Sequence, residues 1–451
     1  MESDTTSHFD SIFKAYDIRG LAPAQLNAEM GRRIGAAFAE FADVDRIAVG
    51  RDCRVSSPDI RDGVVEGITS QGVHVDDLGE IATDMMYFYS GHCAMPGLMI
   101  TASHNTGEWN GIKLCLAGAA PVGAESGLMT VKDIAQNPPS HKTSTGSVTE
   151  VNILDDYVDH LFSIVDKSRF RTLRVAADGG NGMAGVALRS VFQRIESELI
   201  GLYLTPDGSF PNHPPDPLRP ENLVDLVSLM GEERPDLGVA FDGDADRAFF
   251  IDDQRVPLPG STTTAIIAAW FLDRFPGESI VHNLICSKAV PEAVVSAGGT
   301  PIRTRVGHSY IKEVMKESNA VFGGEHSGHY YFRDNYRADS GMLAMLVLLQ
   351  VVSEAGVPLS EIRRQYEPYA PSGEINFDVA DKQAAIEAVS LAYEHANQDR
   401  LDGLTVDFGE SWFNLRPSNT EPVLRLNAEA PTAGDVAELV AQVSKIFLEE
   451  A

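Results

Sequence analysis

Residues 96–113, with the sequence PGLMITASHNTGEWNGIK, carry the pattern from which the fold can be worked out. They begin with an apolar run short enough for a buried strand, which ends in a small polar turn at 101–105. That turn places Ser103 directly beside His104, and a single lysine, Lys113, follows. The serine is either an ordinary turn residue or a chemically active one, and the rest of the chain bears on the choice.

Helix-like and strand-like segments alternate on the amino-terminal side of this turn. Residues 24–42 repeat apolar side chains at helical spacing, and 46–50 form a short apolar run typical of a strand. A second helical segment near 58–70 and a second strand at 72–79 follow. This alternation predicts an α/β fold.

The same pattern restarts further along the chain. Residues 172–182 predict a strand that ends in a glycine-rich turn, 279–284 predict another strand, and 339–356 predict a buried helix that Gly356 ends. The segment after 371 instead places two helices among several strands, which suggests a small α+β domain. A chain of 451 residues is long enough for three or four domains with several cores.

The composition narrows the range of partners. Lys and Arg number 36 against 65 Asp and Glu, a formal net charge of −29. Nucleic acids and anionic membrane surfaces require basic faces, so neither is expected as a partner, whereas a locally basic cleft could still receive an anionic small molecule. The four cysteines lack CxxC spacing, the first residues lack the regions of a signal peptide, and the longest apolar run, 341–352, is too short to cross a bilayer. We expect a reduced, cytoplasmic protein.

Three carboxylates stand at every second position in FDGDADRAFF, residues 241–250. On an extended chain Asp242, Asp244 and Asp246 would lie on one side, where they would repel one another without a cation. Oxygen ligands in this number suit a hard divalent ion. An EF-hand is excluded because its sixth position requires glycine and Arg247 stands there. A solvated acidic turn is the alternative, although it gains nothing from aligned acids.

Two later loops and one early segment also gather polar groups. FGGEHSGHYYF, residues 322–332, suits recognition of neighbouring sugar hydroxyls, although a structural polar loop would have the same pattern. LRPSNTEP, residues 415–422, combines a guanidinium, hydroxyls and an amide, which suit a phosphate dianion, and a hairpin turn is its alternative. FKAYDIRG, residues 13–20, is uninformative by itself.

Together, TASHN with the following NGIK, then DGDADR, GEHSGH, RPSNTEP and the leading KAYDIRG resemble the motifs of the α-D-phosphohexomutase superfamily. The resemblance covers essentially the whole chain and is nearest to the phosphomannomutase/phosphoglucomutase branch. It implies a heart-shaped molecule in which three mixed α/β domains and a C-terminal α+β domain each send one motif to a central cleft. The expected domains are residues 1–148, 149–255, 256–370 and 371–451.

The resemblance also implies a role for each motif. Ser103 would be carried as phosphoserine and would hold one Mg²⁺ per chain together with the three aspartates. The third loop would contact the sugar, and the fourth would hold the phosphate that is not being transferred. The implied substrate-binding residues are Tyr16, Lys312, Glu325, Ser327, His329, Arg416, Ser418, Asn419 and Thr420.

Phosphoryl transfer explains why these residue types are needed. A phosphoserine beside three carboxylates is tolerable only with a divalent ion, and the reaction depends on positioning and electrostatics. Arg247 could stabilise the transferring oxygens. Lys113 is a candidate general base if its desolvated site lowers its pKa, and His308 is the rival acid or base. Arg19 would steady the phosphoserine region.

The expected reaction interconverts hexose 6-phosphate and hexose 1-phosphate, with mannose or glucose as the sugar. The phosphoserine would give its phosphoryl group to the substrate, and the bisphosphorylated sugar would turn end for end before returning the other phosphate. Glucose or mannose 1,6-bisphosphate would then be the activator, and the enzyme would be a monomer or dimer. Thr106, Ala245 and His326 stand where the family often has Pro, Gly and Met. The departure at His326 keeps a phosphoglucosamine mutase as the nearest alternative.

Other classes of protein are also to be weighed. A serine hydrolase would pair Ser103 with His104, but adjacent side chains rarely point at one another and no GxSxG elbow is present. A metal-dependent sugar phosphatase would use the same metal and phosphate loops without a resting phosphoserine. A non-catalytic sugar-phosphate sensor would not need the reactive groups that this chain retains.

Overall fold

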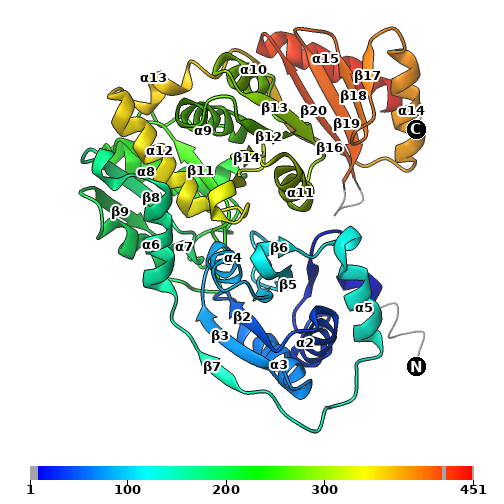
Figure 1. Ribbon diagram of the computed structural model, residues 1–451. Helices are drawn as coiled ribbons and strands as arrows, with labels where there is room; N and C mark the ends of the chain where they lie inside the picture. Colours follow the sequence, from blue (N-terminus) through cyan, green and yellow to red (C-terminus); the bar gives the residue numbers. More distant parts are fainter. Residues whose placement is uncertain (1–8, 419–422, 449–451) are drawn as a thin grey trace.

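The computed structural model describes residues 9–418 and 423–448. Four sheets follow one another along this part of the chain, each with its own helices (Figure 1). The first three combine parallel and antiparallel strands, and the fourth is antiparallel throughout. The predicted architecture of three mixed α/β domains and a C-terminal α+β domain is confirmed.

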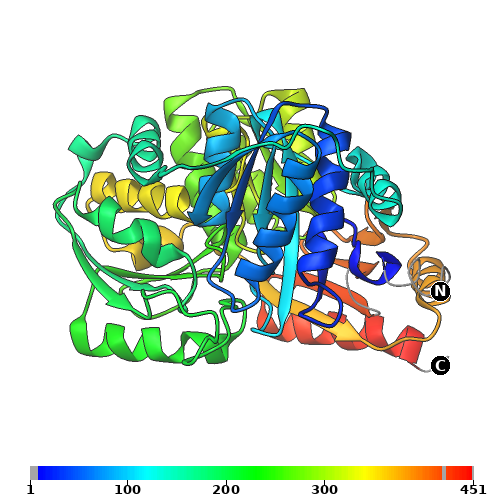
Figure 2. The ribbon, with the colours of Figure 1, turned by 90° about the horizontal axis from the view of Figure 1, so that it is seen from below.

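The first domain is built on a seven-stranded sheet with the order β1-β5-β4-β2-β3-β7, and β6 pairs with β5. Helices α2 and α3 lie side by side (Figure 2). The helix predicted at 24–42 begins only at Ala28, because the Asn27 side chain accepts a hydrogen bond from the Met30 amide and caps it. Its elements are β1 (Ile18–Leu21), α2 (Ala28–Ala42), β2 (Arg46–Arg51), α3 (Ser57–Ser70), β3 (His74–Glu80), α4 (Thr83–His92), β4 (Gly97–Ile100), β5 (Trp109–Leu116), β6 (Ala120–Pro121), α5 (Leu128–Gln136) and β7 (Val148–Glu150).

The second domain has the strand order β11-β10-β8-β9, in which β9, β8 and β10 are parallel and β11 is antiparallel. Its elements are α6 (Leu154–Ile164), β8 (Arg174–Asp178), α7 (Ala184–Phe192), β9 (Glu198–Leu202), α8 (Val224–Glu233), β10 (Leu237–Phe241) and β11 (Ala248–Ile251).

The third domain repeats this order as β15-β14-β12-β13, again with one antiparallel strand, β15, at the edge. Gly356, at a φ of 67°, ends its buried helix α12 as predicted. Its elements are α9 (Gly260–Arg274), β12 (Ser279–Asn283), α10 (Ala289–Ser296), β13 (Thr300–Thr304), α11 (His308–Ser318), β14 (Phe322–Gly324), β15 (Tyr330–Phe332), α12 (Gly341–Ala355) and α13 (Leu359–Arg363).

The fourth domain is a five-stranded antiparallel sheet, β16-β20-β19-β18-β17, with two helices. Its elements are β16 (Ala370–Phe377), α14 (Lys382–Ala392), β17 (Asn397–Asp399), β18 (Leu404–Asp407), β19 (Trp412–Pro417), β20 (Leu424–Ala430) and α15 (Ala433–Leu448). Two predicted domain boundaries, 148/149 and 370/371, fall inside strands β7 and β16, and the boundaries stay predictions.

One topological position recurs in the first three domains. The first sheet contains the order β5-β4-β2-β3, which matches β11-β10-β8-β9 and β15-β14-β12-β13. In each, the chain leaves a parallel strand, turns and returns along the antiparallel strand beside it. These turns carry Ser103, the three aspartates and Glu325–His329 respectively. Three of the sequence motifs therefore lie at equivalent positions of three similar domains.

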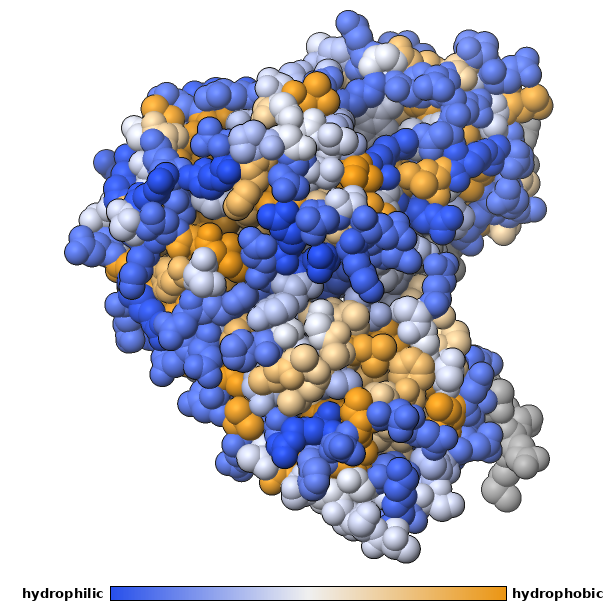
Figure 3. All heavy atoms as spheres, viewed as in Figure 1, coloured by the Kyte–Doolittle hydropathy of each residue, from blue (hydrophilic) through white to orange (hydrophobic). Residues whose placement is uncertain are grey.

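One large apolar cluster joins the first three domains, whereas the fourth domain has a cluster of its own and meets the third through a small apolar contact of Leu284 and Ile285 with Trp412. One buried cluster includes Phe88 of α4, Tyr157 of α6 and Leu346 of α12, which belong to different domains. The buried cluster of the fourth domain lies entirely within residues 379–447. A hollow separates the first domain from the fourth on one side of the molecule (Figure 3). Among the described residues, no helix has both the length and the apolar character needed to span a membrane.

A buried carboxylate links the first three domains. Asp84, in α4, is 1% exposed, and its Oδ2 accepts hydrogen bonds from the Tyr157 hydroxyl at 2.5 Å and the Ser340 hydroxyl at 2.6 Å. Burial raises the pKa of Asp84 to about 7, although both hydroxyls oppose that rise. Ionising this group inside the fold is therefore unfavourable.

We expect the Asp84→Asn variant to reveal this cost as a pH dependence of stability. The folded protein holds the Asp84 proton more tightly than the unfolded chain, so its contribution is complete below pH 4 and is lost as pH rises through about 7. Between pH 4 and 8 the wild type should lose stability relative to the variant, on the order of 4 kcal/mol. Urea unfolding across this range measures it. Asp155→Asn, at an exposed aspartate of α6, is the control. Parallel stability curves for wild type and Asp84→Asn would contradict the expectation.

Candidate active site

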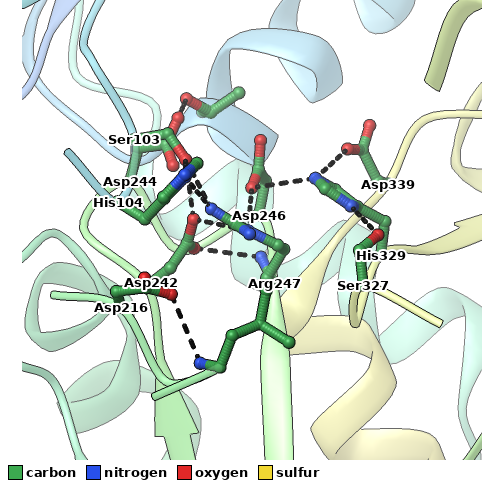
Figure 4. Close-up of polar contacts among 12 residues, drawn as sticks. Ser103, His104, Asp216, Asp242, Asp244, Asp246, Arg247, Ser327, His329 and Asp339 are labelled. Atoms are coloured by element: carbon green, nitrogen blue, oxygen red, sulfur yellow. Dashed lines mark hydrogen bonds and ion pairs between the residues drawn. The ribbon is translucent and has the colours of Figure 1, made fainter. Parts of the chain in front are cut away.

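Ser103 lies in the turn between β4 and β5. Its backbone has a φ of 52°, a left-handed conformation, and its amide donates to Thr101 Oγ1 at 2.9 Å. The hydroxyl donates to Asp242 Oδ2 at 2.8 Å and accepts from Arg247 Nη2 at 3.0 Å. The turn therefore presents the serine oxygen to both a carboxylate and a guanidinium of the second domain (Figure 4).

The three aspartates occupy the turn between β10 and β11, and all are buried. Their arrangement differs from the predicted extended chain. Ala245 adopts a φ of 63°, so the backbone turns and the carboxylates converge, with one oxygen of each within 4.8 Å of the others. Gly243 is required because a Cβ there would lie 2.3 Å from the Ser103 carbonyl oxygen. The two motif turns are in direct backbone contact.

The aspartate cluster is suited to a divalent cation. Within the described residues, Asp244 Oδ1 and Asp246 Oδ1 are buried and make no hydrogen bond. Burial, with a contribution from the neighbouring carboxylates, raises the pKa of Asp242 to about 8 against the opposing Arg247 charge. Hard oxygen ligands left without partners inside a protein match the preferences of Mg²⁺. The donor set fits the predicted ion.

Lys113 does not have the lowered pKa that we expected of a base. Its Nζ lies 2.7 Å from Asp244 Oδ2 and 2.6 Å from Asp246 Oδ2. Burial acts to lower the pKa of Lys113, but the two carboxylates together hold it well above the ordinary value. Here Lys113 is an ammonium among the metal aspartates.

The side chains of Ser103 and His104 do approach each other, contrary to the argument used against the hydrolase. His104 Nδ1 lies 3.2 Å from the serine Oγ because the left-handed serine bends the turn. However, Arg247 also donates to Nδ1. Burial, with the Arg247 and Arg19 charges, holds the pKa of His104 well below its usual value. A nitrogen already occupied by a guanidinium is poorly placed to take the serine proton.

The third motif lies in the turn between β14 and β15, where Gly328 has a φ of 83°. Its Glu325, Ser327 and His329 side chains lie close together. Glu325 is 2% exposed and accepts from Asn283 at 3.1 Å and Tyr331 at 2.6 Å. Its contact with sugar hydroxyls therefore stays a prediction, because the carboxylate is engaged inside the protein here.

His329 lies nearer the metal aspartates than the sequence indicated. Its Nδ1 is 3.0 Å from Ser327 Oγ, and its Nε2 is 3.7 Å from Asp246 Oδ1 and 4.0 Å from Asp339 Oδ2. The side chain thus joins the second and third motifs. It is the imidazole best placed to exchange a proton near the aspartate cluster.

His308 is half-buried, and Lys312 is buried. Burial, with the nearby Lys312 charge, lowers the pKa of His308 to about 3, which makes it a weak base at neutral pH. Lys312 is 4% exposed and pairs with Asp339 Oδ1 at 2.8 Å. Tyr16 donates to the Val306 carbonyl at 3.0 Å and packs edge-on against His308. The predicted roles of His308 as acid or base and of Lys312 as a substrate ligand are not supported by these contacts.

Arg19 contacts the serine turn as expected. Its Nη1 donates to Asn105 Oδ1 at 2.5 Å, and its Nη2 pairs with Asp17 at 2.5 Å. It therefore links the KAYDIRG segment to the turn that carries Ser103.

The fourth motif begins at the end of β19. Arg416 is 3% exposed, donating to Asn427 Oδ1 at 2.7 Å and to Glu374 Oε2 at 2.9 Å. Ser418 is described, whereas Asn419 and Thr420 lie outside the described residues. To bind a phosphate, Arg416 would have to exchange its Glu374 partner for the ligand.

His326 lies beside α9 and lines a cavity against the fourth domain. Its Nδ1 lies 3.1 Å from Ser261 Oγ, and it lines a cavity of about 300 Å³ together with residues of the fourth domain, such as Trp412 and Asn427. In this structure His326 belongs to the contact between the third and fourth domains.

Sequence reasoning missed Arg54, which is fully buried beneath the serine turn. Its Nε pairs with Asp52 at 3.0 Å, and its other nitrogens bind backbone carbonyls of the turn and of β5. No local pattern distinguishes a buried arginine from a surface one. The acceptors are the carbonyl oxygens of Ser103 at 2.7 Å, Asn105 at 2.7 Å, Thr106 at 2.7 Å and Trp109 at 3.1 Å.

Comparison with known proteins agrees with this geometry. Profiles described as phosphoglucomutase/phosphomannomutase alpha/beta/alpha domains I, II and III match residues 10–138, 155–255 and 259–369, and the C-terminal domain profile matches 374–446. The chain belongs to the phosphoglucomutase/phosphomannomutase family. The resemblance drawn from the motifs is confirmed.

Members of this family are similar to the chain over nearly its whole length. The phosphohexose mutases of Xanthomonas campestris pv. campestris are 38% identical over 439 residues, 96% of this chain and 98% of that protein. The phosphomannomutase of Escherichia coli K12 is 37% identical over 452 residues, 97% and 98% of the two chains. A family protein from Burkholderia thailandensis has a solved structure with a TM-score of 0.88 and 28% identity, covering 97% of this chain and 96% of its own.

Proposed function

We propose that this chain interconverts hexose 6-phosphates and hexose 1-phosphates, using Ser103 as the phosphate carrier and a bisphosphorylated sugar as the intermediate. The observation that carries the proposal is the Ser103 hydroxyl, held between Asp242 at 2.8 Å and Arg247 at 3.0 Å beside two further buried carboxylates. Mannose and glucose phosphates are the proposed substrates, because relatives of similar length are phosphomannomutases and phosphohexose mutases.

Each site residue has a separate role in the proposed phosphoryl transfer. In the first half-reaction the bond between Ser103 Oγ and phosphorus breaks while a sugar hydroxyl oxygen bonds to phosphorus. The sugar hydroxyl proton leaves for His329, and Arg247 stabilises negative charge on the transferring group. The departing Ser103 oxygen takes a proton from water, which restores the serine hydroxyl. Asp242, Asp244 and Asp246 would hold Mg²⁺, which supplies positive charge that screens the phosphoserine and polarises its phosphoryl group. The second half-reaction reverses these steps at the other end of the sugar.

The proposal is tested by the phosphorylation state of Ser103 during turnover. Incubation with glucose 1,6-bisphosphate should add about 80 Da to the intact protein, and the added mass should map to Ser103. Mannose 1-phosphate or glucose 1-phosphate should then remove it. A chain that hydrolyses these phosphates without ever accepting phosphate on Ser103 would instead be a sugar phosphatase. The value of kcat/KM for glucosamine 1-phosphate in the same assay tests the amino-sugar alternative.

Arg416→Ala should weaken substrate binding more than it slows chemistry. We expect KM to rise at least about tenfold with a smaller change in kcat, because Arg416 would hold the phosphate that does not react. Steady-state kinetics with mannose 1-phosphate measure both values. Arg400→Ala, which removes an arginine paired with Glu387 in the same domain, is the control. An unchanged KM in Arg416→Ala would show that the fourth loop does not bind the substrate phosphate.

A further inference from the structure

A second group of possible metal ligands adjoins the three-aspartate cluster. It consists of Asp246, His329 and Asp339, and one ligand atom of each lies within 4.8 Å of the others. Asp246 and Asp339 are 1% and 2% exposed. Figure 4 shows the His329 ring lying between the two carboxylates.

The carboxylates each direct one oxygen at the imidazole and the other at an ammonium. Asp246 Oδ2 pairs with Lys113 at 2.6 Å, and Asp339 Oδ1 pairs with Lys312 at 2.8 Å. The remaining oxygens, Asp246 Oδ1 and Asp339 Oδ2, lie 3.7 and 4.0 Å from His329 Nε2. Within the described residues, the buried Asp246 Oδ1 makes no hydrogen bond, and Arg247 Nε stays 4.0 Å from it. In the described part of the chain, Asp246 Oδ1 is therefore buried with only long ion pairs, to His329 and Arg247, and Asp246 belongs both to this group and to the three-aspartate cluster.

The far side of the imidazole faces a hydroxyl and a carboxylate. His329 Nδ1 lies 3.0 Å from Ser327 Oγ, which can donate or accept, and 3.6 Å from Glu325 Oε2. The carboxylate can only accept, so it favours the tautomer with the proton on Nδ1, and that tautomer has its lone pair on Nε2, on the side of the other two carboxylates. Metal-binding histidines are commonly oriented in this way by a carboxylate or hydroxyl behind the ring.

We propose that Asp246, His329 and Asp339 form a second cation site, selective for a transition metal such as Zn²⁺ or Co²⁺ over Mg²⁺. One nitrogen and two carboxylate oxygens suit these metals, whereas Mg²⁺ prefers oxygen ligands alone. Zn²⁺ bound at about 2.0–2.2 Å places its ligands about 3.4 Å apart. The carboxylate oxygens, now 3.7 and 4.0 Å from Nε2 and within 4.8 Å of each other, would draw closer on binding the ion. Such an ion would share Asp246 with the three-aspartate cluster and occupy the nitrogen of His329, so it would inhibit turnover. Binding itself does not depend on the sugar chemistry.

Co²⁺ titration of the full-length protein, followed by absorption spectroscopy, tests the site. We expect two Co²⁺ per chain in the wild type, and visible bands typical of nitrogen coordination for one of them. His329→Gln and Asp339→Asn should each weaken that ion by at least about tenfold. His282→Gln, which removes another buried histidine of the third domain, should leave both ions bound.

A protonated His329 would neutralise the same carboxylates without a metal, and the titration distinguishes the two. A single Co²⁺ per chain, or a second Co²⁺ that both variants bind with unchanged affinity, would overturn the proposal. Crystals of the wild type soaked in Co²⁺ provide a measurement that does not depend on the variants folding. An anomalous peak between Asp246, His329 and Asp339 supports the site, and peaks confined to other positions refute it.

Discussion

Ser103→Ala should lower mutase turnover by at least about a thousandfold, because the proposed cycle carries the phosphoryl group on the Ser103 oxygen between the two ends of the sugar. The alanine methyl removes the oxygen that Asp242 and Arg247 contact, and it leaves the surrounding turn in place. Substrate affinity, measured by calorimetry with mannose 1-phosphate, should change far less. The variant should also fail to gain about 80 Da on exposure to glucose 1,6-bisphosphate.

Ser209→Ala, at an exposed serine of the second domain, is the control for this experiment. It should retain turnover and phosphate uptake. Near-normal turnover in Ser103→Ala would mean that phosphate passes through another residue or directly between sugars, and the proposed cycle would have to be abandoned.

Arg54→Met should reduce kcat about a hundredfold with little change in KM. Arg54 binds four backbone carbonyls around the serine turn, and its hydrogen bonds within the described part of the chain reach none of the proposed substrate-binding residues. Its loss would let the serine oxygen drift from Asp242 and Arg247, and displacements of about 1 Å can cost about a hundredfold in rate. The rate at which glucose 1,6-bisphosphate phosphorylates Ser103 should fall in parallel.

Two further variants separate positioning from simple loss of stability. Arg54→Lys should restore little of the rate, since one ammonium cannot replace a planar group that reaches four carbonyls and Asp52 at once. Arg51→Met removes a partly exposed arginine at the end of β2 and should leave kcat unchanged. If Arg54→Met unfolded at a lower temperature but phosphorylated Ser103 at the normal rate, Arg54 would be structural only.

Much of the fold follows from local patterns. The short apolar runs, the helical repeats and Gly356 predicted strands and helices that the structure contains, because these signals act within a few residues. In the sequence, the shared architecture of the first three domains showed only as an alternation of strands and helices that starts again further along the chain. Which strands pair depends on contacts distant in the sequence, so the order itself required the structure.

Site residues could be predicted from the sequence where the chemistry requires one residue type, as at the three aspartates. They were harder to predict where the neighbouring groups in the fold decide a residue's pKa or burial. The three aspartates converge as predicted, but through a turn at Ala245 rather than an extended chain. The expectation of a low pKa for Lys113 failed because its partners, Asp244 and Asp246, come from another domain. Arg54 and Asp339 carried no sequence signal because only burial makes them distinctive.

The separation of apolar cores has a consequence for how the family diversifies. The fourth domain packs its core within residues 379–447, and it meets the third through the small apolar contact at Trp412 and through ion pairs such as Lys288–Asp407 at 2.6 Å and Arg303–Asp399 at 2.5 Å. Substitutions in its loop can therefore accumulate without disturbing the shared core that supports the serine and the aspartates. A lineage can alter how it holds the non-reacting phosphate while it inherits the transfer chemistry intact.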